Sequence, residues 1–374
     1  MHFERTKKDE KGQNCRKEFA KGVIMGEYGT SKNKDMGNMT PKERIIAIIN
    51  GQPYDRIAVT PIFMAWAAHF IGRTYRDYYL NGDILVQAQL AVVEAFDIDQ
   101  ISVISDPWRE ASAYGMTFDY PEQGVGKPRE LFINTPDDVK TLKPLDMTAS
   151  DRMQQRVDSV AVMAAEIGQT HSVLGWVEGP LAEYANLRGL EQTMIDLIDQ
   201  PELFHEAAEI ITQNAIDFAV AQIRSGADMI GIGDAAASLV GAALYEHNVL
   251  AYEKHLIDAI HEEGGLAKLH ICGNISSIVK AMATTGADVI DVDWMVPLDE
   301  ARKQVGEKVT LCGNFNPSGV LLQGTVQDVA EVAKDCIEKG GERFILMPGC
   351  EVPQNTPEEN IRAFCPVTMI DKVL

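Results

Sequence analysis

Short apolar runs alternate with longer amphipathic stretches along most of the chain. Each run is continuous rather than alternating, which is typical of a strand that is buried on both faces of a parallel sheet. The runs predict eight strands: Ile57–Pro61, Gln100–Ser105, Ser172–Trp176, Met229–Gly233, Leu266–Ile271, Val289–Val292, Val309–Cys312 and Phe344–Met347.

The stretches between these runs repeat apolar residues at helical spacing. Thr40 as an N-cap, with Pro41 at the first helical position, predicts a helix that extends to Asn50 and stops at Gly51. Further helices are expected at Leu85–Phe96, Pro201–Ser225, Tyr245–Glu263, Ile275–Thr285 and Val326–Lys339.

Eight strands that alternate with helices are the count of a closed (β/α)8 barrel, an α/β TIM barrel. The turn-rich segment Ala113–Met147 would then be an insertion after the second strand, either a hairpin or a lid. A doubly wound open sheet has the same rhythm and is the structural alternative, although no GxGxxG follows the first strand. We therefore expect a single barrel domain at 41–374 and a flexible N-terminal extension at 1–40, where no period is sustained.

Composition narrows the classes of partner. The 374 residues carry a formal net charge of −21, which argues against nucleic acid because its phosphates would be repelled. No run approaches the ~18 apolar residues of a membrane span, and the first residues lack the apolar core of a signal peptide. Six cysteines at irregular spacing favour reduced thiols. A cytoplasmic protein without a nucleic-acid or membrane partner is expected.

Three side chains that could bind a metal follow two of the predicted strands. His270 and Cys272 are two residues apart, so alternation places them on one face, about 7 Å apart at Cα. Cys350 follows the last strand. One imidazole and two thiolates suit zinc and leave a fourth position open. Each of these residues alone is more often a packed cysteine or a hydrogen-bonded histidine, but together at strand ends they favour a metal.

Other polar residues are expected at the same edge of the barrel, because barrel enzymes act at the carboxyl ends of their strands. Asp106 and Asp234 are candidates for acid–base catalysis, and Glu178 for catalysis or for the fourth metal position. Asp234 could instead cap a helix, and Glu178 could merely bind a neighbouring loop. Glu351 follows Cys350 directly, and alternation would turn it to the other side. The expected substrate contacts are Trp66, His69, Trp108, Tyr184 and Asn314, although such aromatic residues more often belong to a core.

Several segments resemble the uroporphyrinogen decarboxylase superfamily. They are DWMVPLDEAR at 293–302, VTLCGNFNP at 309–317 and GCEVPQNTPEEN at 349–360. The likeness begins near residue 40 and implies the family's (β/α)8 barrel. Asp106 matches the family's substrate-binding aspartate. The decarboxylase itself fits less well, because Ala65 and His69 stand where its arginines would hold carboxylates and Cys350 replaces a family histidine.

The pattern His270-x-Cys272 with Cys350 is similar to the zinc motif of another branch, the corrinoid-linked methyltransferases of the methylcobalamin:coenzyme M type. This resemblance implies a zinc-dependent enzyme that moves a methyl group between a small molecule and the cobalt of a separate corrinoid protein. The small molecule would be a thiol, a methyl ether or a methylamine. Because no Asp-x-His-x-x-Gly signature is found, methylcobalamin or another corrinoid would arrive on a partner. A metal-independent decarboxylase of a carboxylated substrate is the alternative, and a non-catalytic binding barrel is a third possibility.

Overall fold

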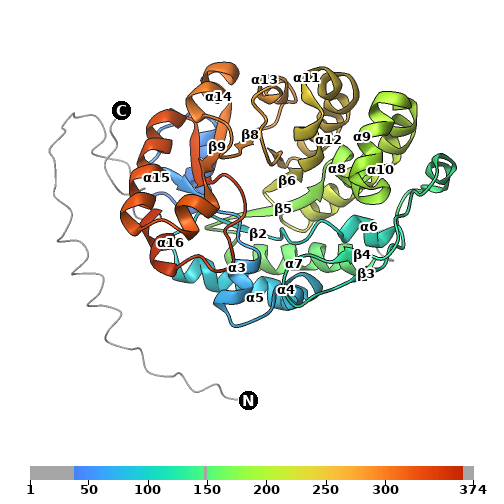
Figure 1. Ribbon diagram of the computed structural model, residues 1–374. Helices are drawn as coiled ribbons and strands as arrows, with labels where there is room; N and C mark the ends of the chain where they lie inside the picture. Colours follow the sequence, from blue (N-terminus) through green and yellow to red (C-terminus); the bar gives the residue numbers. More distant parts are fainter. Residues whose placement is uncertain (1–37, 147–149, 365–374) are drawn as a thin grey trace, which may run out of the picture. The chain divides into compact units, whose positions relative to one another are not determined.

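The computed structural model describes residues 38–146 and 150–364, so most of the extension expected at 1–40 lies outside them. Eight parallel strands form one sheet in the order β1-β10-β9-β8-β7-β6-β5-β2 (Figure 1). All eight predicted strands are present, and the predicted TIM barrel is confirmed. The strands are β1 Ala58–Val59, β2 Gln100–Ser102, β5 Ser172–Glu178, β6 Met229–Gly233, β7 Leu266–His270, β8 Val289–Val292, β9 Thr310–Phe315 and β10 Phe344–Pro348.

The barrel closes between β1 and β2 through Asp99. The backbone N–H of Asp99 donates to the carbonyl of Val59 at 2.8 Å, and the Asp99 carboxylate accepts the N–H of Val59 at 2.7 Å. Arg44 and Arg56 both pair with this carboxylate, so its buried charge is compensated. The sheet is therefore closed, and the doubly wound alternative is wrong.

The labelled helices lie around the outside of the sheet (Figure 1). The helices are α2 Pro41–Ile49, α3 Ala65–Phe70, α4 Tyr75–Leu80, α5 Gly82–Ala95, α6 Arg109–Ala113, α7 Asp151–Ile167, α8 Pro180–Arg188, α9 Leu190–Asp199, α10 Pro201–Arg224, α11 Gly241–Leu244, α12 Leu250–Glu262, α13 Val279–Met282, α14 Leu298–Val305, α15 Val326–Gly340 and α16 Glu358–Phe364. Short 3-10 or π turns lie at Pro136–Thr141, Ala235–Leu239, Tyr245–Val249 and Pro317–Leu322.

Helix α2 closes the amino-terminal end of the barrel. It starts at Thr40, whose side chain forms a capping box with Glu43, as the sequence predicted. It contacts β1, β5 and β10. Its isoleucines complete the cluster of buried side chains that fills the barrel: Ile45, Ile48, Ile49, Ala58, Ile62, Ile104, Leu174, Trp176, Met229, Val289, Cys312, Ile345 and Met347. Because α2 covers the amino-terminal end, the carboxyl ends of the strands are the open end of the barrel, where a functional site can form.

The insertion after β2 contains the predicted hairpin, formed by antiparallel strands β3 (Phe118–Asp119) and β4 (Lys127–Pro128). Trp108 anchors it, because its indole N–H donates to the carbonyl of Gly126 at 2.8 Å and its ring packs on Phe118. No helix in the described part of the chain is long and apolar enough to cross a membrane.

The helix expected at Ile275–Thr285 is shorter than predicted and is confined to α13. The side chain of Asn274 accepts the N–H of Ser276 at 3.1 Å and holds the chain in a turn before the helix. Such local side-chain hydrogen bonds compete with helix formation.

Candidate metal centre

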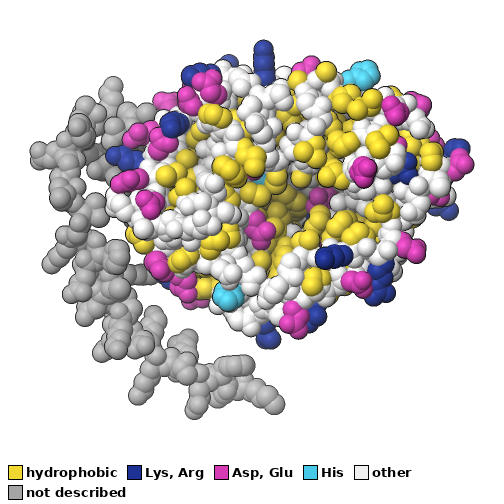
Figure 2. Space-filling model, viewed as in Figure 1, with side chains coloured by type: hydrophobic (Ala, Val, Ile, Leu, Met, Phe, Trp, Pro, Cys, Tyr) yellow, Lys and Arg dark blue, Asp and Glu magenta, His cyan; other side chains and the backbone are white. Residues whose placement is uncertain are grey.

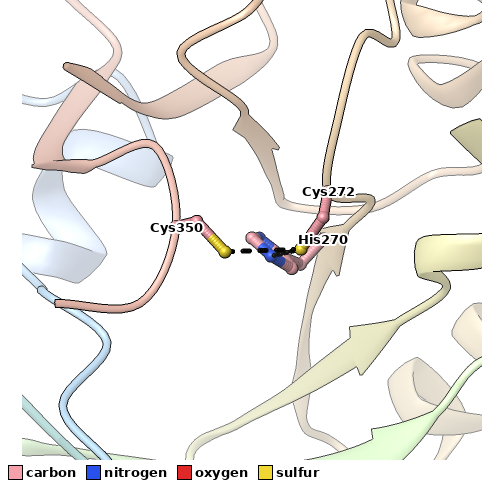
Figure 3. Close-up of side chains that lie close together, drawn as sticks. All are labelled: His270, Cys272 and Cys350. Atoms are coloured by element: carbon pink, nitrogen blue, oxygen red, sulfur yellow. Dashed lines mark hydrogen bonds between the residues drawn. The ribbon is translucent and has the colours of Figure 1, made fainter. Parts of the chain in front are cut away.

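The structure brings His270, Cys272 and Cys350 together at the carboxyl ends of β7 and β10 (Figure 3). Their ligand atoms all lie within 4.8 Å of one another. His270 Nε2 is 2.9 Å from the sulfur of Cys272, and the two sulfurs are 3.5 Å apart. His270 is the last residue of β7, and Cys350 lies two residues beyond the end of β10. Strands β7 and β10 are separated by β8 and β9 in the sheet, but their carboxyl ends open on the same end of the barrel, so all three side chains meet there.

This spacing fits a tetrahedral zinc site. Zn–S bonds of about 2.3 Å separate two thiolates by roughly 3.8 Å, and a thiolate and an imidazole by roughly 3.6 Å. The observed separations need to open by less than about 1 Å to reach these values. Among the described residues no fourth His, Cys or carboxylate atom joins the group, so Glu178 is not part of it.

A second layer of charged residues orients the imidazole. The Nδ1 atom of His270 lies 3.0 Å from Asp291, whose other oxygen lies 3.2 Å from Nζ of Lys268. Both Asp291 and Lys268 are buried. A carboxylate at Nδ1 fixes the tautomer and leaves Nε2 to act as the ligand, as second-layer carboxylates do in zinc sites.

Neither Asp291 nor Lys268 was among the residues singled out from the sequence. The sequence nevertheless contained a signal for this pair. Each residue is a charge inside an otherwise apolar run that predicts a buried strand: LAKLH at 266–270 and VIDV at 289–292. A charge in a buried strand has to be paired. The two breaks in adjacent strands could therefore have predicted this ion pair.

Hydrogen bonds within the cluster set the protonation of the three ligands. The hydrogen bond with Cys272 lowers the pKa of Cys350 to about 4 and raises that of Cys272. Burial lowers the pKa of His270, but hydrogen bonds with Asp291 and Cys350 outweigh it and raise the value to about 10. Binding of a metal therefore has to release protons from His270 and Cys272.

The indole ring of Trp176, which we call the aromatic floor, lies beside the cluster. The ring of Trp176, on β5, has its centroid 6.0 Å from that of the His270 imidazole. Two glycines of β6 make room for the indole: a Cβ atom at Gly231 would lie 2.2 Å from the ring, and one at Gly233 would lie 2.9 Å away. The candidate ligands thus have an apolar neighbour on the β5 side and the charged pair of Asp291 and Lys268 on the β8 side.

Asp293 supports the ligand loop from the next strand. Its carboxylate accepts the N–H of Gly273, directly after Cys272, at 3.0 Å and the N–H of Met295 at 2.9 Å. The bond from Gly273 ties the loops after β7 and β8 together, and the bond from Met295 holds the turn after β8.

Two of the three predicted catalytic carboxylates are paired with arginines. Both oxygens of Asp106 contact the guanidinium of Arg152, at 2.5 and 3.1 Å. Burial raises the pKa of Asp106, but Arg152 outweighs it and the net shift is downward. Glu178 accepts from Arg109 at 2.8 Å. Its burial nevertheless raises its pKa to about 8.

The third, Asp234, has no exposure to solvent and sits against the first turn of α8. Its carboxylate accepts the N–H groups of Leu181 at 3.3 Å and Ala182 at 2.6 Å. Burial raises its pKa to about 7. This placement favours the capping role, here for a helix from another part of the chain, over acid–base catalysis.

Three of the five predicted substrate contacts direct their polar atoms into the protein. The indole of Trp66 donates to the carbonyl of Thr356 at 2.8 Å, and the hydroxyl of Tyr184 donates to Asp196 at 2.9 Å. The amide of Asn314 donates to two carbonyls in the segment after β8, at 2.7 and 3.3 Å. Trp66 and Tyr184 also belong to the main hydrophobic core. Their placement favours packing over ligand binding.

The other two lie on the surface layer. Trp108 is half-buried against the hairpin, and His69 is exposed on α3. As substrate contacts, both remain predictions.

Glu351 faces α3 instead of continuing a strand alternation. Strand β10 ends at Pro348, so the pleat does not extend to Glu351. Its Oε1 atom accepts the N–H of Ala65, the first residue of α3, at 3.0 Å. Burial raises its pKa to about 7.

The face of the molecule shown in Figure 2 is hollowed at its centre, with hydrophobic walls and acidic side chains.

Comparison with known proteins identifies relatives across nearly the whole described chain. The family model described as uroporphyrinogen decarboxylase (URO-D) matches residues 40–368. The methylcobamide:CoM methyltransferase MtaA of Methanosarcina barkeri is 24% identical over 339 residues, covering 88% of this chain and 97% of that protein. MtbA of Methanosarcina acetivorans is 26% identical, with 87% and 97% covered.

Decarboxylases are also similar. The uroporphyrinogen decarboxylase of Parasynechococcus marenigrum is 28% identical over 305 residues, covering 78% of this chain and 84% of that protein. Among solved structures, a methyltransferase from Methanosarcina mazei superposes with a TM-score of 0.76 at 22% identity, covering 88% of this chain and 98% of that one. This likeness supports the barrel fold.

Proposed function

The chain belongs to the uroporphyrinogen decarboxylase family, and we propose that it is a zinc-dependent methyltransferase that works with a corrinoid protein. It moves a methyl group between a small molecule and the cobalt of the corrinoid on that separate protein. The observation that carries the proposal is the convergence of His270, Cys272 and Cys350, with ligand atoms within 4.8 Å of one another. Relatives named methylcobamide:CoM methyltransferases match this chain over 97% of their own length, which supports the same class of reaction.

His270, Cys272 and Cys350 would hold the metal. Zinc bound there would keep a substrate thiol ionised at neutral pH, or would polarise a departing oxygen or nitrogen. Asp291 holds the Nδ1 proton of His270, so that Nε2 remains the ligand atom. Asp293 fixes the loop after Cys272. Together these residues order the site before substrate arrives, which reduces the cost of positioning it.

Decarboxylation without a metal is the second candidate, because relatives named uroporphyrinogen decarboxylase are 28% identical over 78% of the chain. Asp106 would be its substrate-binding carboxylate. However, Arg152 contacts both oxygens of Asp106, and Ala65 supplies no basic side chain to an acidic substrate. The arrangement of His270, Cys272 and Cys350 would also have no role in that reaction.

The metal content of the purified protein tests the proposal. Mass spectrometry of protein prepared without a metal-binding tag should find about one zinc per chain in the native protein. Cys350→Ala should lose the metal. Cys336→Ala is the matched control, because Cys336 is a buried cysteine on α15, away from the cluster. With methylcobalamin and a thiol, the native protein and the control should consume methylcobalamin, and Cys350→Ala should not.

A metal-free protein after reducing, zinc-replete purification would overturn the zinc mechanism. Equal zinc in the native protein and Cys350→Ala would overturn the assigned ligand set. In the first case the decarboxylase candidate would come to the front, and loss of carbon dioxide from a carboxylated substrate would be the next measurement.

A further inference from the structure

We infer that the small molecule handled at this site carries a positively charged amine, and that Glu351 sets this preference over an anionic group. The inference rests on the proposed function, because it concerns the substrate of the same site. It follows from which charged groups of the described chain remain available beside the metal-binding cluster.

The first observation is the position of Glu351, which directly follows the ligand Cys350. One oxygen of its carboxylate accepts the N–H of Ala65 at 3.0 Å. A free backbone N–H at this place could have bound an anionic substrate group, and the protein fills it with its own carboxylate. The second oxygen has no described hydrogen-bond partner, and the residue is partly exposed. It is therefore available to a donor from outside the chain.

The second observation is that three arginines on α6 and α7, near the carboxyl ends of β2 and β5, already donate to protein acceptors, although Nε of Arg109 and Nε of Arg152 have no hydrogen-bond partner in the described chain. Arg109 pairs with Glu178 at 2.8 Å, and Arg152 pairs with Asp106 at 2.5 Å. Arg156 donates to the hydroxyl of Ser105 and to a backbone carbonyl. Each of these three guanidinium groups thus has a protein acceptor, and an anionic substrate would have to compete for it.

The lysine on β7 also offers no free cation to an anionic substrate. Lys268 lies two residues before His270 on β7 and is buried, and its ammonium is paired with the Asp291 oxygen that His270 does not contact. Acidic side chains, but not basic ones, show within the hollow of the molecular surface (Figure 2). An ammonium group could donate to the second oxygen of Glu351, whereas a sulfonate or carboxylate has no proton to donate to it.

Three thiols that differ only in their head group test the inference: cysteamine with an ammonium, mercaptoethanol with a hydroxyl, and mercaptoethanesulfonate with a sulfonate. Binding is measured on protein loaded with cobalt(II) instead of zinc, by the charge-transfer absorption that a thiolate–cobalt bond produces. This readout needs no turnover. We expect affinity to fall in the order ammonium, hydroxyl, sulfonate, with about tenfold or more between the first and the last.

Glu351→Gln tests the residue. Glutamine keeps a carbonyl oxygen for the N–H of Ala65 but removes the charge, so the spread between cysteamine and mercaptoethanesulfonate should shrink to about threefold or less. Glu359→Gln is the matched control, because Glu359 is an exposed glutamate on α16, and it should leave the spread unchanged. Tighter binding of the sulfonate, an unchanged spread in Glu351→Gln, or no binding of any of the three thiols would overturn the inference.

The same samples separate this inference from the proposed function. If the expected order of affinities is found but the zinc protein transfers no methyl group from methylcobalamin, the proposed function fails and the charge preference stands. If methyl transfer occurs and favours mercaptoethanesulfonate, the proposed function stands and the charge preference fails.

Discussion

The Nδ1 atom of His270 lies 3.0 Å from Oδ2 of Asp291, and the carboxylate is fully buried. The two residues are direct partners in the register of the parallel strands β7 and β8. Their contact is thus set by the backbone pairing rather than by a mobile loop. The imidazole is held in one orientation, with Nε2 turned toward the sulfur of Cys272 at 2.9 Å. The geometry of the cluster therefore depends on a residue that is not itself a ligand.

Replacing that carboxylate should weaken metal binding. Asp291→Asn removes the charge that stabilises the Nδ1–H tautomer, and second-layer changes of this kind typically cost about 10- to 100-fold in metal affinity. Competition with a chelating dye measures zinc affinity directly. The control is Asp288→Asn, which alters a similar carboxylate–histidine contact, 2.8 Å from His261. Unchanged zinc affinity in Asp291→Asn would show that the contact does not support the site.

Lys268 should matter for folding through the same carboxylate. Its ammonium lies 3.2 Å from Asp291, and both groups are buried. With zinc bound, His270 would be a neutral ligand, so Lys268→Met would leave the Asp291 carboxylate without a cation, and breaking a buried pair in this way costs about 3–5 kcal/mol of unfolding free energy. Denaturant unfolding measures the loss.

Two further variants make this expectation specific. Lys254→Met removes one member of an exposed ion pair with Asp258 and should cost about 0.5 kcal/mol or less. Adding Asp291→Asn to Lys268→Met should recover part of the loss, because the uncompensated charge is gone. A double variant that loses the sum of both single losses would contradict the ion-pair explanation.

Much of the fold could be predicted because its strands are marked by continuous apolar runs, as in MIGIG at 229–233. The ends of the strands and helices were less predictable than their central residues. Strand β5 extends to Glu178, beyond the expected Trp176, because it pairs with β6 up to Gly233. Such extension is decided by the neighbouring strand, which the local sequence does not show. The helix expected from Ile275 starts late for a local reason, because the side chain of Asn274 accepts the N–H of Ser276 and holds a turn there.

The convergence of His270, Cys272 and Cys350 could be predicted because the carboxyl ends of the strands of a parallel barrel share one edge. The state of the carboxylates could not, because their partners come from distant segments. Asp106 meets Arg152 from α7, 46 residues later, and Glu178 meets Arg109, 69 residues earlier. Arginines on helices are usually exposed, so nothing in the local pattern shows that these two are drawn inward.

Glu178 should make stability depend on pH. Burial raises its pKa to about 8, above the value of about 4.3 in an unfolded chain. The folded protein then holds the proton more tightly, so this residue's contribution is fully present below about pH 4 and is lost as pH rises toward about 8. Glu178→Gln cannot lose a proton. Its unfolding free energy relative to the native protein should therefore rise between about pH 5 and pH 8, by on the order of 2–4 kcal/mol.

Denaturant unfolding at several pH values checks this dependence. Glu263→Gln serves as the control, because Glu263 is paired with Arg224 near the surface and its pKa is lowered by that hydrogen bond. It should show no rise over the same range. A pH-independent difference for Glu178→Gln would mean that Glu178 is ionised in the folded protein and is held by Arg109 alone.

The fit between Gly231 and Trp176 should couple packing to metal binding. A Cβ atom at Gly231 would come within 2.2 and 2.4 Å of two atoms of the Trp176 ring, whose centroid lies 6.0 Å from the imidazole of His270. Gly231→Ala should therefore displace the indole from its place beside His270, cost about 1–3 kcal/mol of stability and weaken zinc binding. A double-mutant cycle of Gly231→Ala with Trp176→Leu tests whether the ring causes this loss. In the Trp176→Leu protein the ring is gone, so Gly231→Ala should cost less than about 1 kcal/mol of stability. If Gly231→Ala costs the same in both backgrounds, the ring is not what the glycine accommodates, and the aromatic floor has no part in placing His270.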